Sequence, residues 1–317
     1  ADRAEGGRRF SDIHGTGAGD AASEPVMRPR VVVSVDVDPV DLHLVGYGFT
    51  GLPADPLVYT KALPRLLDVF SRCGISATLF LVGRDAEGNA SNLRAAAEAG
   101  HEIASHTWSH PIGFAGLGAE RQRQELGDSK RALEAASGST VVGFRSPNFD
   151  MNASVVPVLA GLGYRYDASA YPTPVLVPAR LVLATKSADP MRVLAMNPWP
   201  FTWRRDPHDW TAHGATVREF PLAVTPGLRM PVYHTLRYFS DDARFATQLD
   251  GFARRGDTLS YALHAVDALG MQEDGVDPRL AKHPGMDRPL AEKLALLERS
   301  MKALAERFES RTYASLL

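Results

Sequence analysis

The stretch Val31-Val32-Val33-Ser34-Val35-Asp36-Val37-Asp38 decides the fold class of this chain. Its β-branched residues form a short apolar run, which is typical of a strand buried in a parallel sheet. Two aspartates end the run at positions i and i+2, so we expect both carboxylates to leave the strand on the same side. Open α/β sheets and barrels place their sites at this carboxyl end of the strands. A turn or helix-capping role for the aspartates stays open, because Pro39 follows them.

Helical and strand patterns alternate downstream of this run. Apolar residues at helical spacing predict a helix over residues 57–73, which Gly74 ends. Further predicted strands are 76–82, 102–105, 141–144, 164–166 and 259–264, and further predicted helices are 91–99, 119–137, 153–162 and 289–309. Strands separated by helices of about ten to fifteen residues imply βαβ units. The sheet is therefore parallel, either doubly wound or closed as a barrel.

Residues 172–256 interrupt this rhythm, with many prolines and with three of the tryptophans, Trp199, Trp203 and Trp210. We expect loops, short strands and one helix there, as an elaboration of a single domain that spans residues 29–317. The tryptophans could form a wall over a substrate or lie in the core. Residues 1–28 contain arginines, glycines and acids but no apolar signal-peptide region, and we expect them to form a flexible leader.

The composition argues against several functional classes. A formal net charge of −2 gives no global field that would attract nucleic acid or an anionic membrane. No window approaches the ~18 apolar residues that a transmembrane helix needs. Cys73 is the only cysteine, so no intrachain disulfide can form, and its place at a helix end favours a buried structural thiol over a nucleophile. Together with the lack of a signal peptide, these features predict a cytoplasmic protein.

Three further motifs carry chemistry. His106-Thr107-Trp108-Ser109-His110 would place two imidazoles on one face if a helical turn begins there, and they could then share one cation. Arg145 follows a predicted strand and could orient a carboxylate through a bidentate pair, although an ordinary salt bridge is an alternative. His264 ends the last predicted strand, where a structural histidine is also common. Each motif alone has low specificity.

Together, the four motifs resemble those of the NodB-homology polysaccharide deacetylases, carbohydrate esterase family 4. That family carries an acidic motif on its first strand, then His-[Ser/Thr]-x-x-His, Arg-x-Pro and a late Leu-x-His. This chain has, in the same order, Asp36-Val37-Asp38, His106-Thr107-Trp108-Ser109-His110, Arg145-Ser146-Pro147 and Ala262-Leu263-His264. The resemblance covers residues 30–170 well, is thin between 172 and 256 and returns near His264.

The sequence departs from the family pattern at three places. Val37 separates two aspartates that are adjacent in the common motif, which leaves open which acid acts as base and which as ligand. Ala262 stands where the late motif usually has leucine. The aromatic residue that normally follows Arg-x-Pro is displaced by one position, to Phe149.

The resemblance implies a distorted (β/α) barrel with a metal centre built from Asp38, His106 and His110. One carboxylate and two imidazoles suit Zn²⁺, and Co²⁺, Ni²⁺ or Fe²⁺ could also bind. Asp36 would be the general base, Arg145 would keep it ionised and aimed, and His264 would be the general acid. Three further candidates are the backbone N–H groups of Asn148 and Phe149, for an oxyanion, and Asp167, as a support for the arginine.

The implied activity is a metal-dependent amide hydrolase that removes an N-acyl group, usually acetyl, from an amino sugar. Its substrate would be a carbohydrate or glycolipid, such as a soluble or lipid-linked precursor of a glycan or natural product. Alternatives are a deformylase, a hydrolase of cyclic amides such as allantoin, and a catalytically silent carbohydrate-binding relative. A Rossmann enzyme is disfavoured, because no Gly-x-Gly-x-x-Gly follows the first strand. The sequence does not identify the sugar, the acyl group or the oligomeric state.

Overall fold

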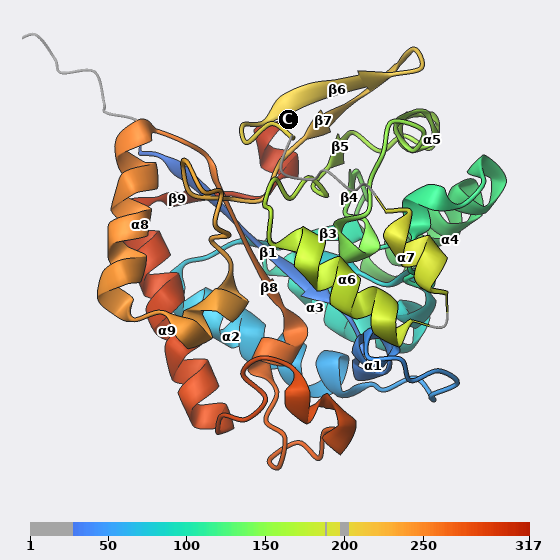
Figure 1. The fold of residues 1–317 in the computed structure, drawn as a ribbon. Coiled ribbons are helices and arrows are strands. Elements are labelled where there is room, and N and C mark those ends of the chain that lie inside the picture. Colours follow the sequence, from blue (N-terminus) through green and yellow to red (C-terminus); the bar gives the residue numbers. More distant parts are fainter. Residues whose placement is uncertain (1–27, 188, 197–202) are drawn as a thin grey trace, which may run out of the picture.

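The computed structural model of the chain describes residues 28–187, 189–196 and 203–317. Its strands form one sheet in the order β6-β7-β5-β4-β3-β2-β1-β8, with β9 paired to β1 (Figure 1). All neighbouring pairs are parallel except the β6–β7 hairpin. The expected leader lies outside the described residues as far as residue 27.

The strands and helices have the following bounds. The strands are β1 (Arg30–Val37), β2 (Ala77–Leu81), β3 (Glu102–Ser105), β4 (Gly143–Phe144), β5 (Tyr166–Asp167), β6 (His208–Ala212), β7 (Ala215–Glu219), β8 (Leu259–His264) and β9 (Glu309–Ser310). The α-helices are α1 (Val40–Gly46), α2 (Leu63–Cys73), α3 (Ala90–Glu98), α4 (Ala119–Ser137), α5 (Val156–Gly161), α6 (Leu176–Lys186), α7 (Pro190–Leu194), α8 (Asp242–Arg255) and α9 (Leu290–Arg307).

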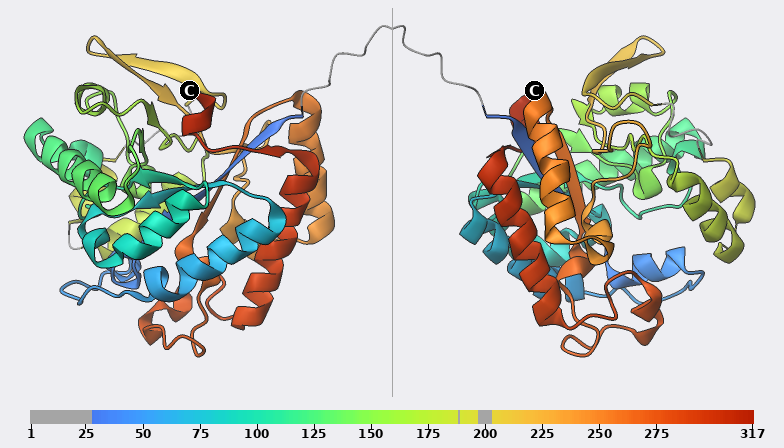
Figure 2. Two further views of the ribbon diagram at one scale, coloured as in Figure 1. Left: turned by 180° about the vertical axis from the view of Figure 1, so that it is seen from behind. Right: turned by 60° about the vertical axis from the view of Figure 1, so that its left-hand side comes forward.

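The apolar run that opens the domain forms the central strand β1. It pairs with β2 on one side and with β8 on the other, and its five valines are fully buried. Helices α2, α3, α4, α8 and α9 surround the sheet, as the two views of Figure 2 show. A strand covered in this way needs apolar residues on both faces, which is why its sequence is a continuous run rather than an alternation.

The chain that follows β7 closes the sheet into a barrel. The N–H of Leu222 donates to the carbonyl oxygen of Ala170, just beyond β5 (2.8 Å). The N–H of the next residue, Ala223, donates to the carbonyl oxygen of Ser260 in β8 (3.1 Å). Since β4 and β5 are only two residues long, the wall is irregular. The expected distorted (β/α) barrel is confirmed.

Residues 172–256 differ from the expectation. Their described part contains three α-helices, α6, α7 and α8, where one was predicted. Pro178 and Pro190 lie in the first turns of α6 and α7. A first-turn N–H has no partner inside the helix, so proline is tolerated there. These two prolines thus lie where helices begin.

No described helix is both long enough and apolar enough to cross a membrane. Trp203 and Trp210 pack against the core, with their ring centres 6.0 Å apart. Trp199 lies outside the described residues. The two described tryptophans of this segment therefore belong with the core.

Candidate metal centre and catalytic site

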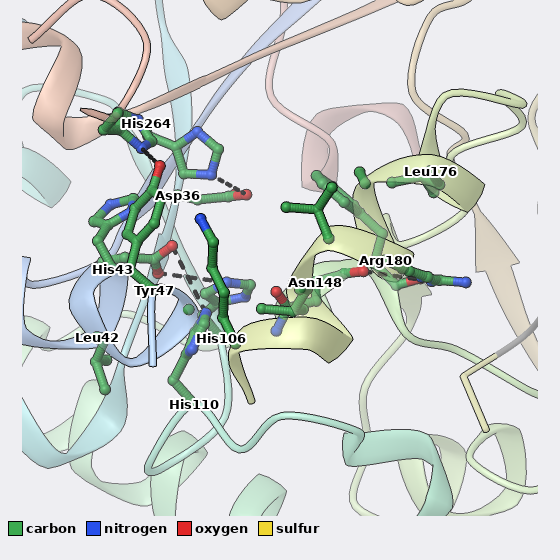
Figure 3. A pocket seen from close by; sticks show the side chains of 18 residues that line it. Asp36, Leu42, His43, Tyr47, His106, His110, Asn148, Leu176, Arg180 and His264 are labelled. Atoms are coloured by element: carbon green, nitrogen blue, oxygen red, sulfur yellow. Dashed lines mark hydrogen bonds and ion pairs between the residues drawn. The ribbon is translucent and has the colours of Figure 1, made fainter. Parts of the chain in front are cut away.

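A cavity of about 320 Å³ lies at the carboxyl ends of the central strands. Helix α1 forms one wall and α6 the facing wall (Figure 3). The structure brings five of the predicted site side chains together in this cavity: Asp36, Asp38, His106, His110 and His264. The two aspartates meet here because the i, i+2 spacing at the end of β1 directs both carboxylates to one side.

Asp38, His106 and His110 form a group that could hold a metal ion, with one ligand atom from each within 4.8 Å of the others. The Nε2 atoms of His106 and His110 lie 3.5 and 3.7 Å from the two carboxylate oxygens of Asp38. These separations are long for hydrogen bonds, but they suit ligands that each approach one cation to about 2.0–2.2 Å.

The burial of the three ligands also fits a cation. Burial, reinforced by the charge of Asp36, raises the pKa of Asp38 well above its usual value. Burial lowers the pKa of His106 to about 4, so its imidazole is neutral. The Oδ1 atom of Asp38 is buried and has no hydrogen-bond partner among the described residues. A buried carboxylate beside neutral imidazoles is unfavourable unless a positive charge compensates it.

The hydrogen bond on the other face of the His106 ring sets its tautomer. Its Nδ1–H donates to the carbonyl oxygen of Arg145 (2.7 Å). The lone pair on Nε2 therefore points toward the metal group, as a ligand requires. The backbone carbonyl of Arg145 thus orients His106, and its side chain pairs with Asp36.

The segment His106–His110 is not a helical turn, which corrects the sequence expectation. Thr107 and His110 have positive φ angles of 68° and 55°. The N–H of His110 donates to the hydroxyl of Thr107 (3.0 Å). The imidazoles therefore converge because of this left-handed loop geometry, and not because of helical i, i+4 spacing.

Glu125 of α4 holds this loop, and sequence reasoning missed it. The carboxylate accepts from the N–H groups of Trp108 (3.1 Å) and Ser109 (2.8 Å), and from the hydroxyl of Ser109 (2.8 Å). Its side chain is 1% exposed. Helix α4 contains several acidic residues in its sequence. The helical pattern alone does not reveal that Glu125 is the one that faces inward.

Asp36 and Arg145 form a buried ion pair, with Nη1 2.6 Å from Oδ1. The guanidinium also donates to the carbonyl oxygen of Ala168 (2.9 Å) and to the hydroxyl of Ser34 (3.0 Å). Burial would raise the pKa of Asp36, but the charges of Arg145 and nearby histidines outweigh it, so the pKa lies below its usual value. The carboxylate is therefore ionised and oriented, as a general base must be.

His264 lies beside this carboxylate, with Nε2 3.9 Å from Oδ2 of Asp36. The two residues are register partners on β1 and β8. The Nδ1 atom of His264 is hydrogen bonded to the hydroxyl of Tyr233 (2.7 Å), and the backbone N–H is capped by Asp267 (3.0 Å). When the phenol donates to Nδ1, the ring proton is on Nε2, which faces the reacting groups. Tyr233 comes from the irregular segment, where sequence patterns gave no indication of it.

Asp167 was expected to support the Arg145 side chain, but it contacts the backbone of the next residue, Ser146, through the hydroxyl of Ser169. It is buried opposite Glu219 in the β5–β7 register. Its carboxylate accepts from the hydroxyl of Ser169 (2.5 Å), which itself accepts from the N–H of Ser146 (2.7 Å). The Arg145 guanidinium donates to the side chains of Asp36, Ser34 and Tyr313 and to the carbonyl oxygen of Ala168. Asp167 therefore fixes the residue after Arg145.

The two oxyanion candidates line the cavity and share a left-handed backbone, each with φ 55°. The N–H of Phe149 donates to the carbonyl oxygen of Ser146 (3.1 Å), so it is already engaged. The N–H of Asn148 is therefore the better candidate donor for a developing oxyanion.

The fold is a parallel α/β barrel, and buried carboxylates and imidazoles gather at the carboxyl ends of its strands. The protein therefore belongs to the general class of α/β barrels with a candidate metal centre. Residues 51–166 match the family model described as polysaccharide deacetylase. The resemblance seen in the sequence is confirmed over these residues, which are similar to the polysaccharide deacetylases of the NodB-homology type. The matched residues include His106, His110 and Arg145. Asp36, Asp38 and His264 lie outside them, so their assignment rests on the geometry.

Relatives with described functions cover part of the chain. It is 27% identical over 143 residues to the peptidoglycan deacetylase of Helicobacter pylori, which is 44% of this chain and 48% of that protein. It is 36% identical over 113 residues to a chitin deacetylase of a Pestalotiopsis species, 34% of this chain and 36% of that protein. The chain thus spans about half or less of the length of these relatives.

A solved structure supports the fold over most of the chain. A Mycobacterium smegmatis protein described as a polysaccharide deacetylase superposes with a TM-score of 0.52 and 19% identity. The superposition covers 92% of this chain and 95% of that one. It shows that the barrel includes the segment on the carboxyl side of the family match.

Proposed function

We propose that the protein is a metal-dependent hydrolase that removes an N-acyl group, in the first place acetyl, from an amino sugar. The observation that carries this proposal is the joint placement of two units in one cavity. One is the metal-binding group of Asp38, His106 and His110. The other is the Asp36–Arg145 ion pair with His264 beside it.

A divalent cation held by the first unit, Zn²⁺ by the preference of its ligands, would polarise the amide carbonyl and make water a better nucleophile. Asp36 accepts the proton of the attacking water, and Arg145 keeps its carboxylate ionised and aimed. The N–H of Asn148 donates to the oxygen on which negative charge develops. His264 donates a proton to the leaving nitrogen, because an amide anion is a poor leaving group.

The substrate class follows from the relatives and from the shape of the site. One relative is named a peptidoglycan deacetylase and the other a chitin deacetylase. In this chain, α6 faces α1 across the cavity. A cavity of about 320 Å³ between two helices favours a small or terminal sugar, such as a soluble or lipid-linked precursor. The cytoplasmic location expected from the composition stays a prediction, which cell fractionation would test.

Metal content and amine release test the proposal together. Mass spectrometry should find about one divalent metal per chain in the wild type, and His106→Ala should lose it. Release of free amine from N-acetylglucosamine oligomers should be abolished in Asp36→Asn, which keeps the metal ligands. Absence of metal after reconstitution, or amine release that does not change in Asp36→Asn, would refute the proposal.

A further inference from the structure

A second group of polar side chains lines the cavity beside His264 and has no role in the proposed reaction. The rings of His43 and His283 have their centres 5.1 Å apart, and the centre of His43 is 5.5 Å from that of His264. The hydroxyl of Tyr47 is hydrogen bonded to Nδ1 of His283 (3.2 Å). Figure 3 shows His43 and Tyr47 on the α1 wall, close to the reacting groups.

Two ring nitrogens of this group are unsatisfied. The Nε2 atoms of His43 and His283 are buried and have no hydrogen-bond partner within the described part of the chain. Burial lowers the pKa of His43 well below its usual value and that of His283 to about 4, so both imidazoles are neutral. Unpaired polar atoms in a cavity wall are costly unless something that enters the cavity binds them.

Lys186, the last residue of α6, brings a cation to the same end of the cavity. Its Nζ lies 5.0 Å from the centre of the Tyr47 ring. The backbone holds it there, since a Cβ atom at Gly48 would lie only 2.4 Å from the carbonyl oxygen of Lys186. Gly48 also has φ +88°, a conformation that other residues adopt at a cost. This close approach of α6 to the end of α1 fixes where the lysine side chain starts.

The charges of the cavity favour an anion at this end. The carboxylates of Asp36 and Asp38 line the cavity and are matched by the cations of Lys186, which also lines it, and of Arg145. Arg145 stands behind Asp36 as its partner. A divalent cation at the metal group would therefore leave the cavity with a net positive charge. A partly desolvated cavity of one sign attracts ligands of the opposite sign.

We propose that the cavity contains a subsite for an anionic group on the substrate, a phosphate or a carboxylate, formed by His43, Tyr47, His283 and Lys186. Lys186 supplies the charge, and the neutral imidazoles supply N–H donors. The subsite deepens the proposed function and rests on it: the preferred substrate is an N-acylated amino sugar that carries a negative charge. Because the subsite adjoins His264, the anionic group is attached close to the leaving nitrogen.

Binding of three sugars tests the subsite without turnover. The metal-loaded Asp36→Asn protein would be titrated by calorimetry with N-acetylglucosamine 1-phosphate, N-acetylmuramic acid and N-acetylglucosamine. We expect at least one anionic sugar to bind about tenfold more tightly than the neutral one, as for one added charge-assisted contact. The preference should weaken as salt is added. The two anionic probes distinguish a phosphate from a carboxylate.

Two variants and a matched control assign the preference to these residues. Lys186→Gln and His283→Phe, each in the Asp36→Asn background, should reduce binding of the preferred anionic sugar about tenfold and leave the neutral sugar unaffected. Lys282→Gln removes the same charge from an exposed lysine outside the cavity lining and should change nothing. Thermal unfolding would check that each variant is folded.

The inference is overturned if anionic and neutral sugars bind equally, if none binds, or if Lys186→Gln behaves like Lys282→Gln. Amine release by the wild-type protein is judged separately. Asp36-dependent release from neutral sugars, without any anionic preference, would sustain the proposed function and remove the subsite.

Discussion

Glu125→Gln should release the loop that carries both candidate metal-binding histidines. The carboxylate accepts three hydrogen bonds from Trp108 and Ser109, and its side chain is 1% exposed. Glutamine has nearly the same volume but only one acceptor oxygen. Its amide NH₂ cannot accept a hydrogen bond, so either two backbone N–H groups lose their acceptor or the NH₂ takes the place of Oε1, where it faces Arg121 and the Ser109 hydroxyl. In both arrangements the loop donors lose a charged acceptor.

The magnitude follows from these contacts. A hydrogen bond to a charged group contributes about 1.5–3 kcal/mol, and an unpaired buried donor costs about 1–3 kcal/mol. Because the remaining oxygen keeps part of the contacts and the Ser109 hydroxyl can accept from the NH₂, we expect the free energy of unfolding to fall by about 1–3 kcal/mol. Metal affinity should fall by about 10–100-fold, as when other partners that orient metal ligands are removed.

Urea unfolding of the metal-free protein and competition with a chromogenic chelator would measure the two effects. The control is Arg121→Ala, which removes a 53% exposed partner of the same carboxylate (2.8 Å) and should cost less than about 1 kcal/mol. Wild-type metal affinity in Glu125→Gln, or an equal loss in Arg121→Ala, would refute the assignment of Glu125 as the support of the loop.

Three further predictions concern the charged groups. Arg145→Lys should raise the pKa of Asp36, because the lysine cannot reproduce the guanidinium contacts; the acid limb of the pH–rate profile should move to higher pH, and an unmoved limb would contradict this. Burial and the charge of Asp167 raise the pKa of Glu219 well above its usual value, so the folded protein holds a proton that the unfolded chain releases, and stability falls as pH rises. Glu219→Gln lacks this titration, so its stability relative to wild type in urea unfolding should increase as pH rises above the usual pKa range of a glutamate; a constant difference would count against it. Chelation should lower the melting temperature, because Asp38 is left buried without a partner, and Zn²⁺ should restore it; identical melting curves would argue against a structural contribution of the metal.

The parts of the fold that local sequence specifies could be predicted. The valines of β1 indicate a strand covered on both faces, and all are buried. Gly74 was expected to end its helix, and it does so in a left-handed conformation with φ +65°. Such features depend on residues close together in the chain, so their patterns carry enough information. The i, i+2 spacing of Asp36 and Asp38 is another feature that depends only on residues close together in the chain.

The parts of the site that depend on distant residues could not be predicted. The left-handed loop of His106–His110 is held by a carboxylate of α4, and no local pattern reports that contact. Tyr233 approaches His264 only because the chain after β7 closes the barrel against β8. Helix α6 was missed because its proline suggested a loop. In each case a tertiary contact, not a propensity, determines the conformation.

The reacting groups and the groups that contact the rest of the substrate come from different parts of this fold. Asp36 and His264 are register partners in adjacent strands, so their separation is fixed by the β1–β8 ladder. Helices α1 and α6 lie outside the sheet and contribute to the cavity through side chains. A change on α6 can therefore alter substrate binding without moving the reacting groups.

Leu183→Ala tests this separation. Leu183 lines the cavity on α6 and packs toward Gly46 of α1, where a Cβ atom would lie 3.9 Å from its methyl group. We expect KM for N-acetylglucosamine oligomers to change while kcat stays within about twofold, since the interaction is equal in the ground and transition states. Steady-state kinetics would measure both constants. A large fall in kcat with KM unchanged would mean that α6 positions the reacting groups after all, and that binding and chemistry are coupled through this helix.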